Sequence, residues 1–173
     1  MDQEALLKRI RRLEDGDAIR KLCSRYSLAV DNHDFPTLRS LFAPDAIYGW
    51  INEAPHAEGA EAIGKLLESR LSSSGPSFHV NHDVIIDWDD GAPGRASGIV
   101  FCHAEVSPPA GQFIGAIRYH DKYVNHDGSW KFAERWLGFL YLAPPQDYAG
   151  LLRSFERIRS SQPQRPAHWP SFA

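Results

Sequence analysis

The feature that most constrains the fold of this chain is a change of hydrophobic period at Pro76. Before Pro76, apolar residues recur every three or four positions, as they do on one face of a helix. After it, apolar and polar residues alternate, which is typical of strands with one buried face. The pattern predicts four strands joined by short glycine-containing turns, over residues 78–88, 94–106, 112–125 and 130–142. Helices followed by an antiparallel meander indicate an α+β fold.

The residues before Pro76 predict the helices that cover this sheet. We expect helices over residues 4–13, 18–31, 35–42 and 59–71, and a short strand over 46–51. The sequence Asp15-Gly16-Asp17 favours a break and a new N-cap between the first two helices. The three later helices are then the elements available to cover the apolar face of the sheet.

The end of the chain predicts an appendage to this domain. Residues 1–143 form the α+β domain, and residues 144–173 hold a helix over 148–159 and a proline-rich tail with Trp169 and Phe172. Leaving such a tail in water would cost about 25 cal/mol per Å² of apolar surface. We therefore expect the C-terminal helix and tail to pack on the same domain or on a neighbouring subunit, over a pocket mouth or a subunit contact.

The composition argues against several classes of partner. The net charge is −3 and no basic stripe is present, so we do not expect nucleic acid as a partner. The sequence contains no run of eighteen apolar residues, so we expect no membrane span. The opening residues lack the apolar core of a signal peptide. Cys23 and Cys102 indicate buried thiols in a reducing compartment, so we predict a cytoplasmic protein. We expect no cofactor, because GxGxxG, P-loop and cysteine-cluster motifs do not occur.

Asp31 and two histidines are the first candidates for chemistry. Asp31 ends the predicted helix 18–31, where its carboxylate opposes the helix dipole at a cost of a few tenths to about 1 kcal/mol. A proton-bearing partner elsewhere in the fold would explain this position, and His79 and His103 lie on two successive predicted strands. The three residue types could ligate a metal, but no HxH or HxxxH spacing supports a site, so we expect none.

Aromatic and basic side chains on the strands are further candidates. Strand alternation places Phe101 on the same face as His103, and gives Tyr119 a common face with two further polar residues. Such aromatic residues predict either core or the wall of a pocket for an apolar ligand. Arg135 interrupts an apolar strand, where an unpaired guanidinium would be costly, so it is either a buried ion-pair member or a ligand contact.

Three stretches resemble a known family. They are YSLAVDNHDFPTLRSLFAPDAIY from Tyr26, HVNHDVIIDWDDG from His79, and YHDKYVNHDGSWKFAERW from Tyr119. The sequence is similar over residues 15–143 to the SnoaL-like branch of the NTF2-like superfamily. That branch includes scytalone dehydratase, bile-acid 7α-dehydratase and hexachlorocyclohexane dehydrochlorinase. The resemblance implies a cone-shaped α+β barrel, with three N-terminal helices folded against a strongly curved, mainly antiparallel sheet and a pocket between them.

The resemblance also implies roles for particular residues. Asp31 and His79 match an aspartate–histidine pair that these enzymes use for proton transfer, and Tyr26 and His103 match further groups of the active site. Substrate contacts are implied by resemblance or by aromatic pattern for a second set: Tyr48, Trp50, Phe101, Tyr119 and Arg135. One departure is Val30, which stands where scytalone dehydratase has a tyrosine, so we do not expect scytalone as the substrate.

The leading hypothesis for function is a cofactor-independent lyase that eliminates water, or another small group such as halide or formaldehyde, from a small apolar or aromatic molecule. The histidine takes a proton while the carboxylate holds its tautomer. Two alternatives stay open, an isomerase of the ketosteroid type that shuttles a proton on Asp31 alone, and a non-catalytic binding module. The last predicts that Asp31 and His79 lie apart. The resemblance further implies a homodimer or homotrimer through the outer face of the sheet.

Overall fold

The computed structural model describes residues 2–53, 56–161 and 163–169. The chain begins with two helices, α1 (Gln3–Asp31) and α2 (Phe35–Ser40), which are followed by the strands β1 (Phe42–Trp50) and β2 (Ala57–Glu58) and by a third helix, α3 (Ala60–Leu71). Four long strands follow: β3 (Phe78–Trp88), β4 (Arg95–Val106), β5 (Phe113–His126) and β6 (Ser129–Ala143). A 3-10 turn, η1 (Pro145–Asp147), and a short helix, α4 (Tyr148–Leu151), complete the set. The predicted α+β class is confirmed.

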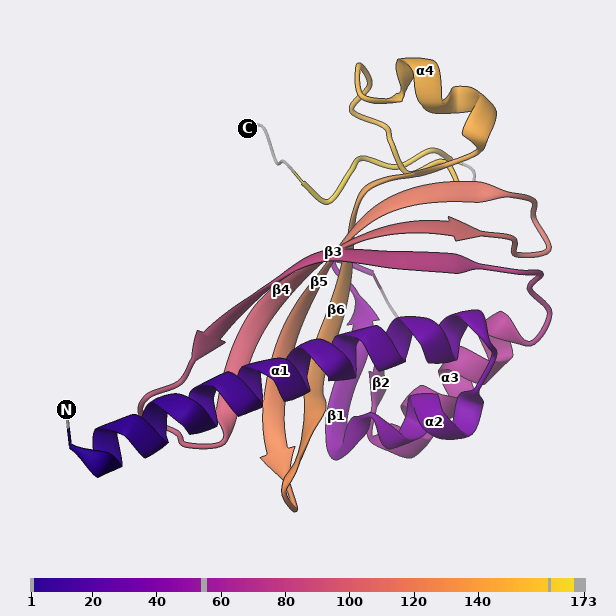
Figure 1. The fold of residues 1–173 in the computed structure, drawn as a ribbon. Helices are drawn as coiled ribbons and strands as arrows, with labels where there is room; N and C mark the ends of the chain where they lie inside the picture. The colour runs from indigo at the N-terminus through magenta and orange to yellow at the C-terminus, as the bar shows by residue number, and fades with distance from the viewer. Residues whose placement is uncertain (1, 54–55, 162, 170–173) are drawn as a thin grey trace.

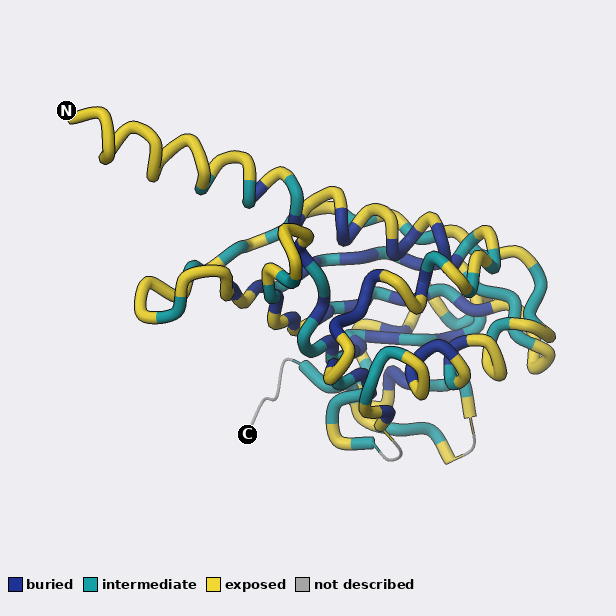
Figure 2. Tube along the Cα trace, turned by 90° about the horizontal axis from the view of Figure 1, so that it is seen from below, coloured by how far each residue is buried: buried dark blue, intermediate teal, exposed yellow. Residues whose placement is uncertain are grey.

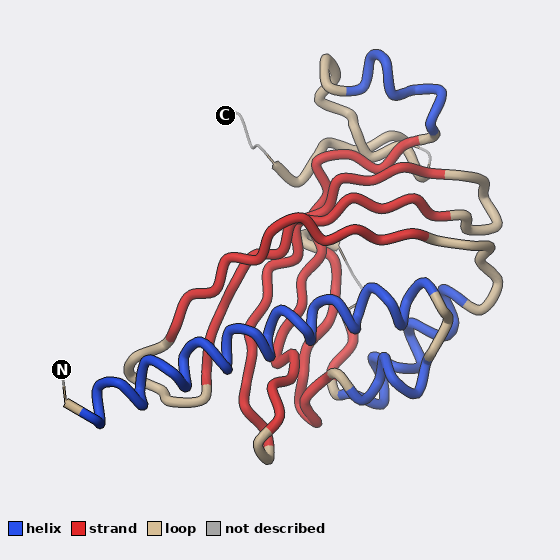
Figure 3. The backbone as a smooth tube through the Cα atoms, in the orientation of Figure 1, coloured by secondary structure: helices blue, strands red, loops and turns tan. Residues whose placement is uncertain are grey.

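A single six-stranded sheet in the order β2-β1-β6-β5-β4-β3 forms the body of the molecule. Only the β1–β6 pairing is parallel, and the four long strands form the antiparallel meander that the sequence predicts. The strands bend strongly, and α1 crosses the concave side of the sheet while α2 and α3 lie beside its C-terminal half (Figures 1 and 3). The helices thus cover the concave side of the curved sheet (Figure 1).

The predicted break in the first helix is wrong, because α1 continues through residues 15–17 without interruption. Its N-cap is Asp2, which accepts a hydrogen bond from the amide of Ala5. The reason lies in tertiary contacts: Asp15 accepts a 2.7 Å hydrogen bond from the Trp130 indole. Gly16 is buried, and a side chain there would meet Trp88 at 3.7 Å. These contacts outweigh the roughly 1 kcal/mol that glycine costs inside a helix.

The two halves of α1 have different surroundings. The C-terminal half is packed on the sheet through a buried stripe that includes Ile19, Cys23, Tyr26 and Val30. The N-terminal half projects beyond the body and is exposed along most of its length (Figure 2). None of the helices in the described ranges is long and apolar enough to cross a membrane.

The predicted helix over residues 148–159 is also wrong, since α4 ends at Leu151. The chain leaves the helix because Ile158 forms a parallel bridge with Leu142 at the end of β6 and an antiparallel bridge with Arg165. Arg157 is buried and donates hydrogen bonds to three backbone carbonyls, those of residues 140, 154 and 169. The tail is therefore held by backbone pairing and by one arginine.

The remainder of the tail lies along the edge of β6, beyond the residues of β6 that pair with β1. Its His168 amide donates to the carbonyl of Phe139, and the Phe139 amide donates to His168 Nδ1. Trp169 lies close to Gly138 and has the Arg118 guanidinium 4.8 Å from its ring centroid. Phe172, which was predicted to cover a pocket mouth or a neighbouring subunit, lies outside the described residues. The predicted homodimer or homotrimer stays a prediction.

Candidate active site

A cavity of about 210 Å³ lies between the helices and the concave face of the sheet. Its walls are mainly apolar and come from every major element, including Tyr26, Tyr48, Trp50, Leu67, Ile117, Tyr119 and Phe139. The polar side chains that line it are few: His33, Arg70, Ser74, Ser77, His79 and Ser107. An apolar cavity with a few convergent polar groups is the usual form of a small-molecule site.

Asp31 and His79 lie in direct contact at this cavity. The Asp31 Oδ1 atom is 2.7 Å from His79 Nδ1, and Oδ2 accepts a 2.9 Å hydrogen bond from the His79 backbone amide. The Ser77 hydroxyl donates a third bond, 2.7 Å long, to Oδ1. The predicted contact between the two side chains is confirmed. Three donors from one strand segment also account for a carboxylate at an otherwise unfavourable helix end.

These donors set the protonation of the pair. Burial raises the pKa of Asp31, but the hydrogen bonds from the His79 ring, the His79 amide and Ser77 outweigh it and leave this pKa below its ordinary value. The carboxylate is therefore ionised at neutral pH and can only accept, so His79 Nδ1 carries the proton. In the neutral ring, Nε2 then holds the lone pair. His79 lines the cavity, and Nε2 is the nitrogen that the bond to Asp31 leaves for a ligand.

Three tyrosines form the floor beside this pair. The hydroxyls of Tyr26 and Tyr48 are 3.1 Å apart, and the Tyr119 ring meets that of Tyr26 edge to face at 5.9 Å. Burial raises the pKa of all three phenols, most strongly those of Tyr26 and Tyr119. The hydroxyls stay neutral at physiological pH and can donate. Because one hydroxyl of the Tyr26–Tyr48 pair donates to the other, the second proton is left for a ligand oxygen.

Arg135 does not line the cavity, and the prediction that it binds substrate is wrong. Its guanidinium is buried and donates to both carboxylate oxygens of Asp121, at 2.9 and 2.8 Å. It is enclosed by aromatic rings, with centroids 3.9 Å away for Phe132, 4.2 Å for Tyr119 and 4.3 Å for Tyr26. The ion pair lies behind the two cavity tyrosines and supports them, so its role is in the core.

The prediction that His103 faces the same cavity is wrong as well. Residues paired across neighbouring strands share a face, and His79 pairs with Ala104, which lines the cavity. His103 therefore points to the opposite face of β4, where its Nε2 is buried without a hydrogen-bond partner among the described residues. Phe101 lies on that same outer face, 5.2 Å from the Arg118 guanidinium, so its predicted contact with substrate is also wrong.

Sequence reasoning named only His79 among the polar side chains that line the cavity, and Ser77 and Arg70 are two that it missed. Ser77 precedes His79 by two positions, and strand alternation alone would have placed it on the same face, beside Asp31. Arg70 lies in the last turn of α3, three residues after the buried Leu67, a spacing that puts both on neighbouring parts of one helix face. The Arg70 guanidinium stacks 3.7 Å from the ring centroid of Trp50.

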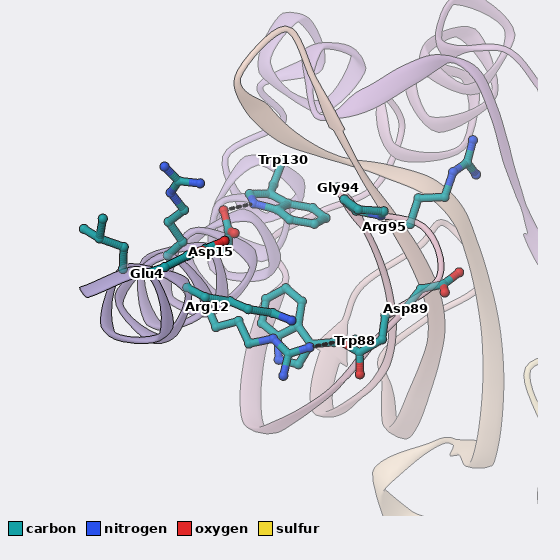
Figure 4. A pocket seen from close by; sticks show the side chains of 13 residues that line it. Glu4, Arg12, Asp15, Trp88, Asp89, Gly94, Arg95 and Trp130 are labelled. Carbon is teal, nitrogen blue, oxygen red and sulfur yellow. Dashed lines mark hydrogen bonds and ion pairs between the residues drawn. The ribbon is translucent and has the colours of Figure 1, made fainter. Parts of the chain in front are cut away.

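A larger hollow of about 520 Å³ lies elsewhere, between the projecting half of α1 and the turn that joins β3 to β4. Figure 4 shows its lining, in which charged side chains of α1 face Trp88 and Trp130. Arg12 forms an ion pair with Asp90, and Asp15 is hydrogen-bonded to Trp130. These two contacts join the walls of the hollow to one another. The smaller cavity holds the titratable pair and is the candidate site.

Metal ligation finds no support in the arrangement of side chains. Within residues 2–53, 56–161 and 163–169, no group of three or more histidine, cysteine, aspartate or glutamate side chains is placed to hold a metal ion. Of the three residues that could have formed a site by type, His103 lies on the far face of the sheet from Asp31 and His79.

A family model described as the SnoaL-like domain matches residues 11–136. The chain belongs to the SnoaL-like family. The fold is the cone-shaped NTF2-like barrel, and a protein from Novosphingobium aromaticivorans assigned as a scytalone dehydratase shares it with a TM-score of 0.70. That protein is 24% identical over 76% of this chain and 88% of its own.

Two further structures show the same fold with differently named activities. Hexachlorocyclohexane dehydrochlorinase LinA-type3 from Novosphingobium barchaimii has a TM-score of 0.69 and 20% identity, over 78% of this chain and 92% of its own. A Novosphingobium aromaticivorans protein assigned as an aromatic ring hydroxylase has the same score and identity, over 79% and 97%. At such identities the likeness establishes the fold, and the activity must be argued from the site.

Proposed function

We propose that this protein is a small-molecule lyase in which Asp31 and His79 act together as the general base. The observation that carries the proposal is the 2.7 Å contact between Asp31 Oδ1 and His79 Nδ1 at the edge of an apolar cavity. An ionised carboxylate fixes the ring tautomer and stabilises the imidazolium, so the second nitrogen can take a proton. The dehydratase and dehydrochlorinase among the similar structures make elimination the favoured reaction.

The proposed step needs only these side chains and the substrate. His79 Nε2 removes a proton from a carbon of the substrate, the electrons of that C–H bond form a double bond, and the leaving group departs from the adjacent carbon with its bonding pair. When the leaving group is hydroxide, we propose that the second proton of the Tyr26–Tyr48 pair is donated to it, and water is released. A halide would leave without that proton.

An isomerase that shuttles a proton on Asp31 is the weaker candidate. Both oxygens of Asp31 accept hydrogen bonds, from Ser77, the His79 ring and the His79 amide. A shuttling carboxylate would have to reach the substrate directly, whereas His79 and not Asp31 is among the residues that line the cavity. A non-catalytic binding module is disfavoured by the same contact, because that alternative requires the two residues to lie apart.

The proposal is tested with a panel of hydroxylated and halogenated ring compounds incubated with wild-type protein, His79→Gln and His82→Gln. Formation of a new double bond is followed by ultraviolet absorbance, and release of halide by ion chromatography. His82 is the matched control, because it is a histidine on the same strand that is exposed and does not line the cavity. We expect wild type and His82→Gln to turn over the same compound.

For His79→Gln we expect a loss of about 10²–10⁴ in rate, the usual contribution of a positioned base. Circular dichroism and the unfolding midpoint establish that the variant is folded. Elimination that persists at the wild-type rate in folded His79→Gln would contradict the proposal, and so would an equal loss in His82→Gln.

A further inference from the structure

Arg70 is the cationic side chain that lines the candidate active-site cavity. It lies in the last turn of α3, where a positive charge complements the helix dipole. The dipole alone does not explain its orientation, because the guanidinium is turned onto the face of Trp50, 3.7 Å from the ring centroid. Trp50 in turn meets Tyr48 edge to face at 5.6 Å. The cation is therefore held against an aromatic wall of the cavity.

The charge of Arg70 is not balanced by a carboxylate of the protein. Within the described ranges, arginines at several other positions have acidic partners, among them Arg39 with Glu61 and Arg159 with Asp147. Arg70 forms no such ion pair among the residues that the structure describes. No carboxylate is among the residues that line the cavity, since Asp31 lies behind His79. The cavity therefore presents a positive group that a ligand can neutralise.

Hydrogen bonds fix the chain segment that follows Arg70. The Ser74 hydroxyl donates a 3.2 Å bond to the Arg70 carbonyl, and the backbone amide of Gly75 donates a 2.7 Å bond to the carbonyl of Ser107, so the segment after α3 is joined to the residue that follows β4. Ser74 and Ser107 both line the cavity. Arg70 is exposed, whereas Tyr26 and Tyr48 are buried. The cavity is thus polar and cationic at the exposed end and apolar at the tyrosine floor.

We propose that Arg70 binds an anionic substituent, such as a carboxylate, on an otherwise apolar ring substrate. A guanidinium held flat on an aromatic ring keeps its edge donors free for two parallel bonds to a carboxylate. The anion then anchors the substrate at the cavity mouth while the ring enters the apolar interior. The placement of the reacting carbon at His79 rests on the proposed function, but recognition of the anion does not.

The test uses two probes of the same shape, 2-naphthoate and the neutral 2-naphthamide, titrated by calorimetry at low ionic strength. Wild type is compared with Arg70→Gln, Arg70→Lys and Lys65→Gln. Lys65 is the matched control, because it is an exposed cation on the same helix that pairs with Glu61 and does not line the cavity. Arg70→Gln and Lys65→Gln make the same change in net charge.

We expect Arg70→Gln to weaken naphthoate binding by about tenfold, as the loss of a charge-assisted bond does, and to leave naphthamide binding unchanged. Arg70→Lys should retain part of the preference, and Lys65→Gln should behave as wild type. Unchanged naphthoate affinity in Arg70→Gln, an equal loss for both probes, an equal loss in Lys65→Gln, or no measurable naphthoate binding by wild type would each overturn the proposal. Because the titration needs no turnover, it can succeed even if elimination by His79 is refuted.

Discussion

Two acid–base pairs lie on the concave side of the sheet, and they differ in access to the cavity. The side chains of Asp121 and Arg135 are 0% and 1% exposed, whereas those of Asp31 and His79 are 17% and 9% exposed. Both pairs have short hydrogen bonds, 2.8 Å in the first and 2.7 Å in the second. Bond length therefore does not separate a structural pair from a candidate catalytic pair, but contact with the cavity does.

The second difference is whether the pair can exchange a proton. Burial alone lowers the pKa of Arg135, but attraction and hydrogen bonds from Asp121 reverse this and leave it well above its ordinary value. The guanidinium thus keeps its charge at every accessible pH. His79, in contrast, lines the cavity, where the ring nitrogen that is not bound to Asp31 can take a proton from a ligand. The Arg135 pair holds the tyrosines of the floor in place, and the His79 pair is suited to chemistry.

The largest expected effect on stability comes from Asp121→Asn. Removal of this charge leaves the Arg135 guanidinium buried and unpaired, which should cost about 3–5 kcal/mol in the free energy of unfolding. Urea denaturation followed by circular dichroism measures it. A loss below about 1 kcal/mol would show that the Asp121–Arg135 pair does not stabilise the core, and the proposed difference between this pair and the Asp31–His79 pair would be contradicted.

Asp31→Asn should reduce turnover strongly and stability only slightly. Its amide would donate to His79 Nδ1 and favour the tautomer with the proton on Nε2, so that the base is blocked. We expect a fall of about 10²–10⁴ in kcat/KM, with less than half of the stability loss of Asp121→Asn. The same denaturation experiment and an elimination assay check both. A large stability loss with retained turnover would reverse the assignment of the two pairs.

Acid should separate the two pairs further. The native pKa of Asp31 lies below its ordinary value, so the unfolded chain takes up this proton first as the pH falls. The stabilisation of the native state by ionised Asp31 is fully present above the pKa of about 4 that an aspartate has in the unfolded chain. It is lost as the pH drops through the lower pKa that Asp31 has in the native state. The stability difference between wild type and Asp31→Asn should therefore be constant from pH 7 to about 5 and should shrink below about 4. A difference independent of pH would contradict this.

The smallest expected effect concerns His168, which binds the edge of β6 through Phe139. Burial lowers the pKa of this histidine, with Glu53 opposing and Arg165 adding to the effect, and its Nδ1 accepts the Phe139 amide. The contribution of neutral His168 to the free energy of unfolding is fully present above the pKa of about 6.5 that a histidine has in the unfolded chain. It is lost as the pH falls through the lower pKa that His168 has in the native state. The protection of the Phe139 amide against hydrogen exchange, relative to its intrinsic rate at each pH, should fall in mild acid, while His168→Gln should leave turnover at neutral pH unchanged. Lost turnover in that variant would show that the tail contributes to the site.

The four long strands could be predicted from the sequence because they rest on a strong local pattern, whereas the choice of His79 as the partner of Asp31 was implied by the family resemblance. Alternation marks the strands, and a carboxylate at a helix C-terminus requires a partner. The course of α1 through Gly16 could not be predicted, since the favourable contacts come from Trp88 and Trp130, which lie far away in the sequence. Local preference favours a break there, and tertiary packing prevails.

The face on which His103 lies is a second example. Alternation places it with Phe101 but does not say which face is concave, and the answer depends on the pairing of His79 with Ala104. A shift of the β3–β4 register by one residue would have turned His103 inward. Arg70 was missed for a different reason: a basic residue in the last turn of a helix has an ordinary explanation in the helix dipole.

The most direct test of the central claim is a double-mutant cycle on kcat/KM with Asp31→Asn, His79→Gln and the double variant, using the substrate identified from the panel. If the two residues act as one base, the loss in the double variant should equal that of His79→Gln alone within about threefold. If the losses multiply, so that their free energies add, Asp31 and His79 contribute independently, and the account of a coupled pair is contradicted.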